Sequence, residues 1–161
     1  HVIELSSFQL ESCPSFHSHI SILLNIAHDH LDRYGAIDHY IRAKKKILNN
    51  NKENYNIISI DDDYCKEIYN SLEKATNIPI SISKKIQKGI YFLDDEIHDN
   101  FFFNDKITLV NNISRSLYGN FNKQNILAAY VVSNILKMNK KKFIKSNKQF
   151  CRATSSIRKN N

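Results

Sequence analysis

The most constraining feature of the sequence is a near-continuous apolar run from Ile20 to Ile26, which reads Ile-Ser-Ile-Leu-Leu-Asn-Ile. The run has the length of one strand, and its lack of alternation favours a buried parallel strand over a surface strand. A helical pattern follows over Asp38 to Leu48, and a second strand pattern over Tyr55 to Ile60. Because strand and helix patterns alternate, the sequence predicts an α/β fold with a mostly parallel sheet and flanking helices.

Weaker patterns complete this outline. The apolar run Val2 to Leu5 predicts the end of a buried strand that Ser6-Ser7 breaks, and three aspartates at positions 61–63 predict a helix start. We expect four further elements: a helix over Tyr64 to Ala75, a half-exposed strand over Ile78 to Ile82, a small antiparallel element over Ile90 to Val110, and a helix over Asn122 to Leu136.

Length and composition indicate one globular domain. The chain has 161 residues, of which 42% are hydrophobic and 24% charged, as is ordinary for a soluble protein. No apolar run is long enough for a membrane span, and no signal peptide is visible. The absence of an initiator methionine suggests that the chain begins inside a larger protein. Three widely spaced cysteines indicate ordinary thiols in a reducing cytoplasm.

The net charge of +7 has two explanations. A basic balance can indicate a nucleic-acid partner. However, Asn, Lys, Ile and Tyr are abundant while Gly and Trp are scarce, as A/T-rich codons would produce. We therefore expect no nucleic-acid partner and no membrane partner.

Polar residues follow the first predicted strand. Glu4 stands where this strand would end, and in parallel sheets ligands bind beyond the carboxyl ends of the strands. The carboxylate of Glu4 could bind Mg²⁺, and the side chains of Ser6 and Gln9 could hold a phosphate or a substrate. The alternative is a solvated loop acid beside a turn.

A second polar cluster, at positions 28–34, follows the most apolar strand and includes His28 and His30. The His-x-His spacing could suggest a transition-metal site, but no other Cys or His group completes one. The lysine run Lys44-Lys45-Lys46 reads as a solvated helix face, except that Lys44, four residues after Tyr40, could turn inward.

A fourth cluster surrounds the start of the last predicted helix. Gly119 allows a turn before the helix, and Asn122 suits an N-cap. A cap explains Asn122 but does not explain Asn125, three residues later.

Taken in this order, the four clusters resemble the Mur ligase family. The string Glu-Leu-Ser-Ser-Phe-Gln-Leu-Glu is typical of its D-glutamate-adding branch, and it is followed by Asp-His-Leu-Asp-Arg, a tyrosine with Ala-Lys, and Gly-x-x-Asn-x-x-Asn. The resemblance covers residues 1–139 and implies part of the central ATP-binding domain. It also implies ATP-dependent addition of D-glutamate to UDP-N-acetylmuramoyl-L-alanine through an acyl phosphate, in the cytoplasm, by a monomer that serves peptidoglycan synthesis.

The resemblance also implies a role for individual residues. Glu4 and His30 match the family's Mg²⁺ ligands. Lys44 matches a catalytic lysine that CO₂ carbamylates, which would convert a cation into an anionic metal ligand. Ser6 and Gln9 match residues near the substrate. The matching residues on the ATP side are Asn122 and Asn125.

The sequence also departs from the family. Phe121 stands where a histidine is usual, and the family's phosphate-binding Gly-x-x-Gly-Lys-Thr/Ser motif does not occur in these residues. We therefore expect the chain alone to be inactive. Residues 140–161 form a basic tail, expected to be disordered or out of frame. One choice of codons for Cys-Arg-Ala-Thr-Ser-Ser, read in a shifted frame, encodes the family's Gly-Leu-Pro-His-Arg.

Two alternatives remain. The first is another ligase of the superfamily, such as a folylpolyglutamate synthase, which the string from Glu4 to Glu11 disfavours. The second is a non-enzymatic basic binding module, which the lack of a clustered basic and aromatic motif disfavours.

Overall fold

The computed structural model describes residues 1–27, 34–48, 51–94, 96–103, 106–109 and 119–138. The chain divides into two compact units, residues 1–78 and residues 79–161. Strand β3 (Thr76–Ser81) begins in the first unit and ends in the second. The expected tail, residues 140–161, lies outside the described residues.

The first unit is built on two parallel strands. β1 (Ile20–Leu23) pairs in parallel with β2 (Tyr55–Ser59), with Leu23 opposite Ile58, and β2 is hydrogen-bonded to β3. The predicted parallel pairing is confirmed, but β1 is shorter than the apolar run. Its residues alternate between half-buried and buried because successive side chains of a strand point to opposite faces of the sheet.

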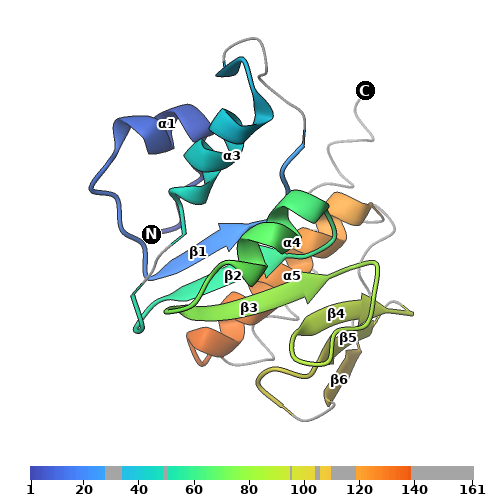
Figure 1. Cartoon of the computed structure of the whole chain (residues 1–161). Helices are drawn as coiled ribbons and strands as arrows, with labels where there is room; N and C mark the ends of the chain where they lie inside the picture. The colour runs from blue at the N-terminus through green and yellow to red at the C-terminus, as the bar shows by residue number, and fades with distance from the viewer. Residues whose placement is uncertain (28–33, 49–50, 95, 104–105, 110–118, 139–161) are drawn as a thin grey trace, which may run out of the picture. The chain divides into compact units, whose positions relative to one another are not determined.

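In its described part, the first unit contains the helices α1 (Ser7–Ser12), α3 (Ile37–Lys45) and α4 (Asp63–Asn70) (Figure 1). α1 packs on α3, and α4 packs on β2. α4 ends at Asn70 rather than at Ala75, because the next residue, Ser71, donates its backbone N–H to carbonyls of the last turn and its hydroxyl to the Ile68 carbonyl at 2.7 Å. The expected strand at Val2 to Leu5 is not found: this segment has no regular secondary structure and pairs with no strand in the described part of the chain, and Val2 and Ile3 are exposed.

The second unit contains the predicted antiparallel element. β4 (Ile90–Leu93), β5 (Glu96–Asp99) and β6 (Lys106–Leu109) pair antiparallel in this order. The end of β3 pairs in parallel with β4, and its residues 78–81 are all buried, so the expectation of a half-exposed strand was wrong. A strand that alternates Ile with small or polar residues is half-exposed only if the polar residues face water. Here the polar residue Ser81 is fully buried.

The connection from β3 to β4 is short for a parallel pair and has no helix. Parallel neighbours usually need a crossover of about a dozen residues or more, whereas only residues 82–89 intervene here. The loop packs closely at Gly89, where a side chain would not fit, because a Cβ there would lie 2.7 Å from the Pro79 carbonyl oxygen. A hydrogen bond also holds the loop, since the Asn100 amide donates to the Ile86 carbonyl at 3.1 Å.

Helix α5 (Asn120–Ile135) packs on β4 in the second unit. A buried hydrogen bond anchors it, because the Tyr130 hydroxyl donates to Asp99 Oδ2 at 2.8 Å. The other carboxylate oxygen of Asp99 accepts the backbone N–H groups of Phe101 and Phe102, at 3.0 and 2.9 Å. Asp99 is thus a buried acid whose two oxygens are both engaged, as burial of a polar group requires.

Removing the Asp62 cap should destabilise the chain. Asp62 precedes α4, and its carboxylate accepts the backbone N–H groups of Cys65 at 2.9 Å and Ile26 at 3.4 Å. We expect Asp62→Ala to lower the free energy of unfolding by about 1–2 kcal/mol, measured by urea denaturation. Asp63→Ala is the matched control, because Asp63 is exposed in the first turn and should cost only a few tenths of a kcal/mol, ~0.3. Equal losses from both variants would contradict the capping role.

Candidate functional site

The residues after Glu4 form a short helix that the sequence analysis missed. Ser6 is the N-cap of α1: its hydroxyl accepts from the Gln9 backbone N–H at 3.3 Å, while Gln9 Oε1 accepts from the Ser6 backbone N–H at 2.8 Å. This reciprocal pair is a capping box, for which Ser-x-x-Gln is a known sequence signature. The signature was present in the sequence and would have identified the helix. It also fixes Ser6 and Gln9 next to each other.

Lys44 turns inward from α3, unlike its neighbours. It is half-buried, whereas Lys45 and Lys46 are exposed. The Lys44 amine donates to the backbone carbonyl of Asn25 at 3.2 Å and lies 5.2 Å from the centre of the Tyr40 ring. The distinction drawn among the three lysines from the sequence is therefore confirmed.

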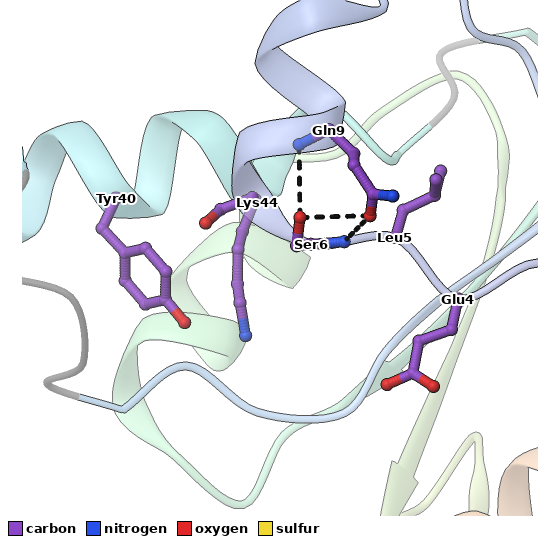
Figure 2. A pocket seen from close by; sticks show the side chains of 7 residues that line it. Glu4, Leu5, Ser6, Gln9, Tyr40 and Lys44 are labelled. Carbon is purple, nitrogen blue, oxygen red and sulfur yellow. Dashed lines mark hydrogen bonds between the residues drawn. The ribbon is translucent and has the colours of Figure 1, made fainter.

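A cavity of about 490 Å³ brings these elements together within the first unit. Its lining comes from the segment before α1, from α1 itself and from α3, and consists of Glu4, Leu5, Ser6, Ser7, Gln9, Tyr40 and Lys44. Figure 2 shows Tyr40 and Lys44 on one side of this opening, Glu4 on the other, and the capping box between them. Four residues singled out from the sequence therefore share one cavity: Glu4, Ser6, Gln9 and Lys44.

Aromatic packing holds the two helices of the cavity together. The ring of Phe8, on α1, stacks on Tyr34 with 5.6 Å between ring centres and 8° between planes. Tyr34 in turn packs on Tyr40 of α3 at 5.5 Å. The Tyr34 hydroxyl also donates to the Glu11 carboxylate at 3.1 Å. The sequence analysis did not assign a role to Tyr34, or to Tyr40 beyond its spacing from Lys44.

The start of α4 lies close to Lys44. Burial, followed by the charge of Asp62 and a hydrogen bond with its carboxylate, raises the pKa of the Cys65 thiol far above its usual range, while the charge of Lys44 opposes this shift. Cys65 and Cys13 are both free thiols, and they differ in accessibility, since Cys65 is fully buried and Cys13 is exposed.

Glu4 provides the carboxylate of the cavity. It is exposed, and carboxylate oxygens are the ligands that Mg²⁺ prefers. Lys44 as an ammonium can only donate hydrogen bonds, but a carbamate on its amine would add a second anionic oxygen donor, so the pair fits a hard divalent cation. Within the described ranges, no group of three or more His, Cys, Asp or Glu side chains could hold a metal. His30 lies outside the described residues.

Asn122 and Asn125 lie in the first turns of α5, in the second unit. Asn122 is half-buried and Asn125 is exposed, and their spacing places both on one side of the helix. The N-cap is Gly119, so the expectation that Asn122 caps the helix was wrong. Of Phe121, the structure describes only its place in the helix.

None of the helices in the described part of the chain is long and apolar enough to cross a membrane.

Comparison with known proteins identifies the family. The family model described as the Mur ligase middle domain matches residues 1–133. A relative from Rickettsia bellii, named UDP-N-acetylmuramoylalanine–D-glutamate ligase, is 43% identical over 93% of this chain. Relatives of the same name are 41% identical in Rickettsia prowazekii, over 93% of this chain, and 40% identical in Caulobacter vibrioides, over 83%. The chain spans about a third of the length of these relatives: 34% in both Rickettsia proteins and 29% in Caulobacter.

The fold agrees with this assignment. The crystal structure of MurF from Acinetobacter baumannii superposes on 89% of this chain, and on 31% of its own, with a TM-score of 0.54 and 18% identity. This α/β chain, with its parallel strands, flanking helices and small antiparallel element, therefore belongs to the Mur ligase family and matches its middle domain.

Proposed function

We propose that this chain is the middle-domain part of an ATP-dependent ligase that adds D-glutamate to UDP-N-acetylmuramoyl-L-alanine in peptidoglycan synthesis. The names of its relatives support the D-glutamate ligase over a folylpolyglutamate synthase. In this proposal residues 1–139 form the part of the domain present here, and residues 140–161 are a tail outside it. The ligase acts in the cytoplasm as a monomer.

The observation that carries the proposal is the cavity shared by Glu4, Ser6, Gln9 and Lys44. Glu4, Ser6 and Gln9 belong to one short segment, residues 4–9, and Lys44 comes from the end of α3. Convergent polar groups in a concavity are the usual sign of a binding site.

The reaction joins a carboxylate to an amine through an acyl phosphate. The terminal carboxylate of UDP-N-acetylmuramoyl-L-alanine attacks the terminal phosphorus of ATP, which releases ADP. The amine of D-glutamate then attacks the acyl carbon, and inorganic phosphate leaves as the amide forms. A bound Mg²⁺ would neutralise part of the negative charge on the phosphate oxygens.

Glu4, Lys44 and His30 are proposed as the metal side of the site. Addition of one CO₂ to the ammonium of Lys44, with release of two protons, would change its charge from positive to negative and would supply oxygens able to hold the cation. The carbonyl of Asn25 can keep a hydrogen bond to the remaining N–H of the carbamate. The half-buried position of Lys44 supports its choice over Lys45 and Lys46.

Ser6 and Gln9 are proposed to face the substrate, with unequal roles. The Ser6 hydroxyl and Gln9 Oε1 are both engaged in the capping box. The Gln9 amide nitrogen is the group of this pair left to donate to a carboxylate or phosphate, and Ser6 holds it in place. Asn122 and Asn125 are proposed to contact ATP.

The proposal predicts that the chain works only in a longer context. We expect the 161-residue chain to release no phosphate in the presence of ATP, UDP-N-acetylmuramoyl-L-alanine and D-glutamate. A chimera in which it replaces the matching portion of the Rickettsia bellii relative should release phosphate when D-glutamate is added to ATP and UDP-N-acetylmuramoyl-L-alanine. Glu4→Gln and Lys44→Arg should each lower that rate by roughly 100-fold or more, because metal-assisted charge stabilisation is worth several kcal/mol.

Lys45→Arg is the matched control for this chimera, since Lys45 is the exposed neighbour of Lys44. It should leave the rate within about twofold, as surface substitutions usually do. A chimera that is active but indifferent to Glu4→Gln and Lys44→Arg would rule out the assigned site.

Carbamylation of Lys44 is a separate prediction. Incubation of the active chimera with ¹³C-bicarbonate, Mg²⁺ and substrate should give one carbamate signal in the ¹³C NMR spectrum. Lys44→Arg should remove this signal and Lys45→Arg should keep it, because Lys44 lines the cavity and Lys45 does not. A signal that survives Lys44→Arg would show that another amine is modified.

A further inference from the structure

Two contacts hold the amine of Lys44 at the cavity wall. It donates to the Asn25 carbonyl at 3.2 Å, and it lies 5.2 Å from the centre of the Tyr40 ring. A cation within about 6 Å of a ring face is attracted by the negative charge of that face. Tyr40 precedes Lys44 by four residues on α3, so the two side chains lie on the same face of the helix.

The Tyr40 ring is itself fixed. Its exposed fraction is 4%, and it belongs to the buried cluster of the first unit together with Tyr34, Ala43 and Cys65. Tyr34 packs on it at 5.5 Å, and Phe8 of α1 stacks on Tyr34 at 5.6 Å. The ring is therefore a rigid surface connected through packed aromatics to the helix that bears Gln9.

The alternative support for Lys44 is weaker. Asn25 lies in the segment after β1 that has no regular secondary structure, and its carbonyl contributes one hydrogen bond. A lysine has a flexible four-carbon stem that a single point contact does not orient. The Tyr40 ring adds a second point of attachment, because its face lies 5.2 Å from the amine.

We infer that Tyr40 is the positioning residue of Lys44: its ring face keeps the amine inside the cavity, on the side facing Glu4. This inference deepens the proposed function and rests on it, because the ring would hold the protonated amine at the place where CO₂ is proposed to add. The contact itself belongs to the first unit alone. It can therefore be tested on the 161-residue chain without ATP, metal or substrate.

The test measures how fast an acylating reagent modifies Lys44. The purified chain and its variants are treated with N-hydroxysuccinimidyl acetate, and acetylation of each lysine is followed by peptide mass spectrometry. Lys46, an exposed residue of the same segment, is the internal reference. Tyr40→Met replaces the ring with a flexible side chain of similar bulk, and Tyr40→Phe keeps the ring.

We expect Tyr40→Met to raise the rate at Lys44 relative to Lys46 by about three- to tenfold, the effect of losing a cation–π contact of intermediate strength. Tyr40→Phe should stay within about twofold of the unchanged chain. An unchanged rate at Lys44 in Tyr40→Met would overturn the inference, as would an equal rise in Tyr40→Phe.

Labelling of Cys65 shows whether Tyr40→Met changes the position of Lys44 alone or disrupts the buried core. It is fully buried in the same cluster as Tyr40, and its thiol should resist iodoacetamide, while exposed Cys13 reacts. The inference requires Cys65 to stay unreactive in Tyr40→Met while Lys44 becomes faster. If Cys65 also becomes reactive, the ring acts on the whole core and the positioning role is wrong. An inactive ligase chimera would leave these labelling results unaltered, so failure of the proposed function can be recognised separately.

Discussion

The parallel pairing of β1 with β2 is the interaction on which the site depends. Because the two strands run the same way, the residues that follow them leave the sheet at the same edge. Asn25 and Ile26 follow β1, Asp62 follows β2, and they meet there, since the Ile26 backbone N–H donates to Asp62. The Asn25 carbonyl accepts a hydrogen bond from the Lys44 amine. An antiparallel pair would send these residues to opposite ends of the sheet.

Two further interactions shape the cavity: the capping box of α1 and the aromatic packing between α1 and α3. The capping box begins α1 next to Glu4, and the stacked rings of Phe8, Tyr34 and Tyr40 fix α1 against α3. Neither contact involves a charge pair. Lys44 is therefore held at the cavity by a backbone carbonyl and by the ring of Tyr40, and no carboxylate among the described residues forms an ion pair with it.

Sequence patterns predicted the elements better than their surroundings. The parallel strands, the antiparallel element and the helix over most of 122–136 followed from periodicity, and the inward turn of Lys44 from its spacing to Tyr40. The failures have physical causes. Val2 to Leu5 is apolar enough for a strand, but a strand needs a hydrogen-bonding partner, and none pairs with it in the described part of the chain. Ser81 is polar yet buried, because its hydroxyl accepts the backbone N–H groups of Ser83 and Lys84.

The sequence predicted which residues belong to the candidate site, but it did not predict how their helices are held together. Residue types and order pointed to Glu4, Ser6, Gln9 and Lys44, but no pattern showed that Tyr34 and Tyr40 would join their helices, because aromatic contacts between distant segments leave no local period. The missed helix α1 shows the opposite situation, since its capping box is a local signal. Asn122 was misread as a cap because Gly119, three residues earlier, can begin the helix without a side-chain hydrogen bond.

The most direct test of this account is to locate a bound cation on the chain. Mn²⁺, a paramagnetic substitute for Mg²⁺, broadens the NMR signals of nuclei near it. We expect titration of the 161-residue chain with Mn²⁺ to broaden first the amide signals around Glu4 and α1, and Glu4→Gln to abolish this broadening. Broadening centred instead on Asp61 to Asp63, or unchanged by Glu4→Gln, would contradict the claim that the cavity between α1 and α3 is the metal side of the site.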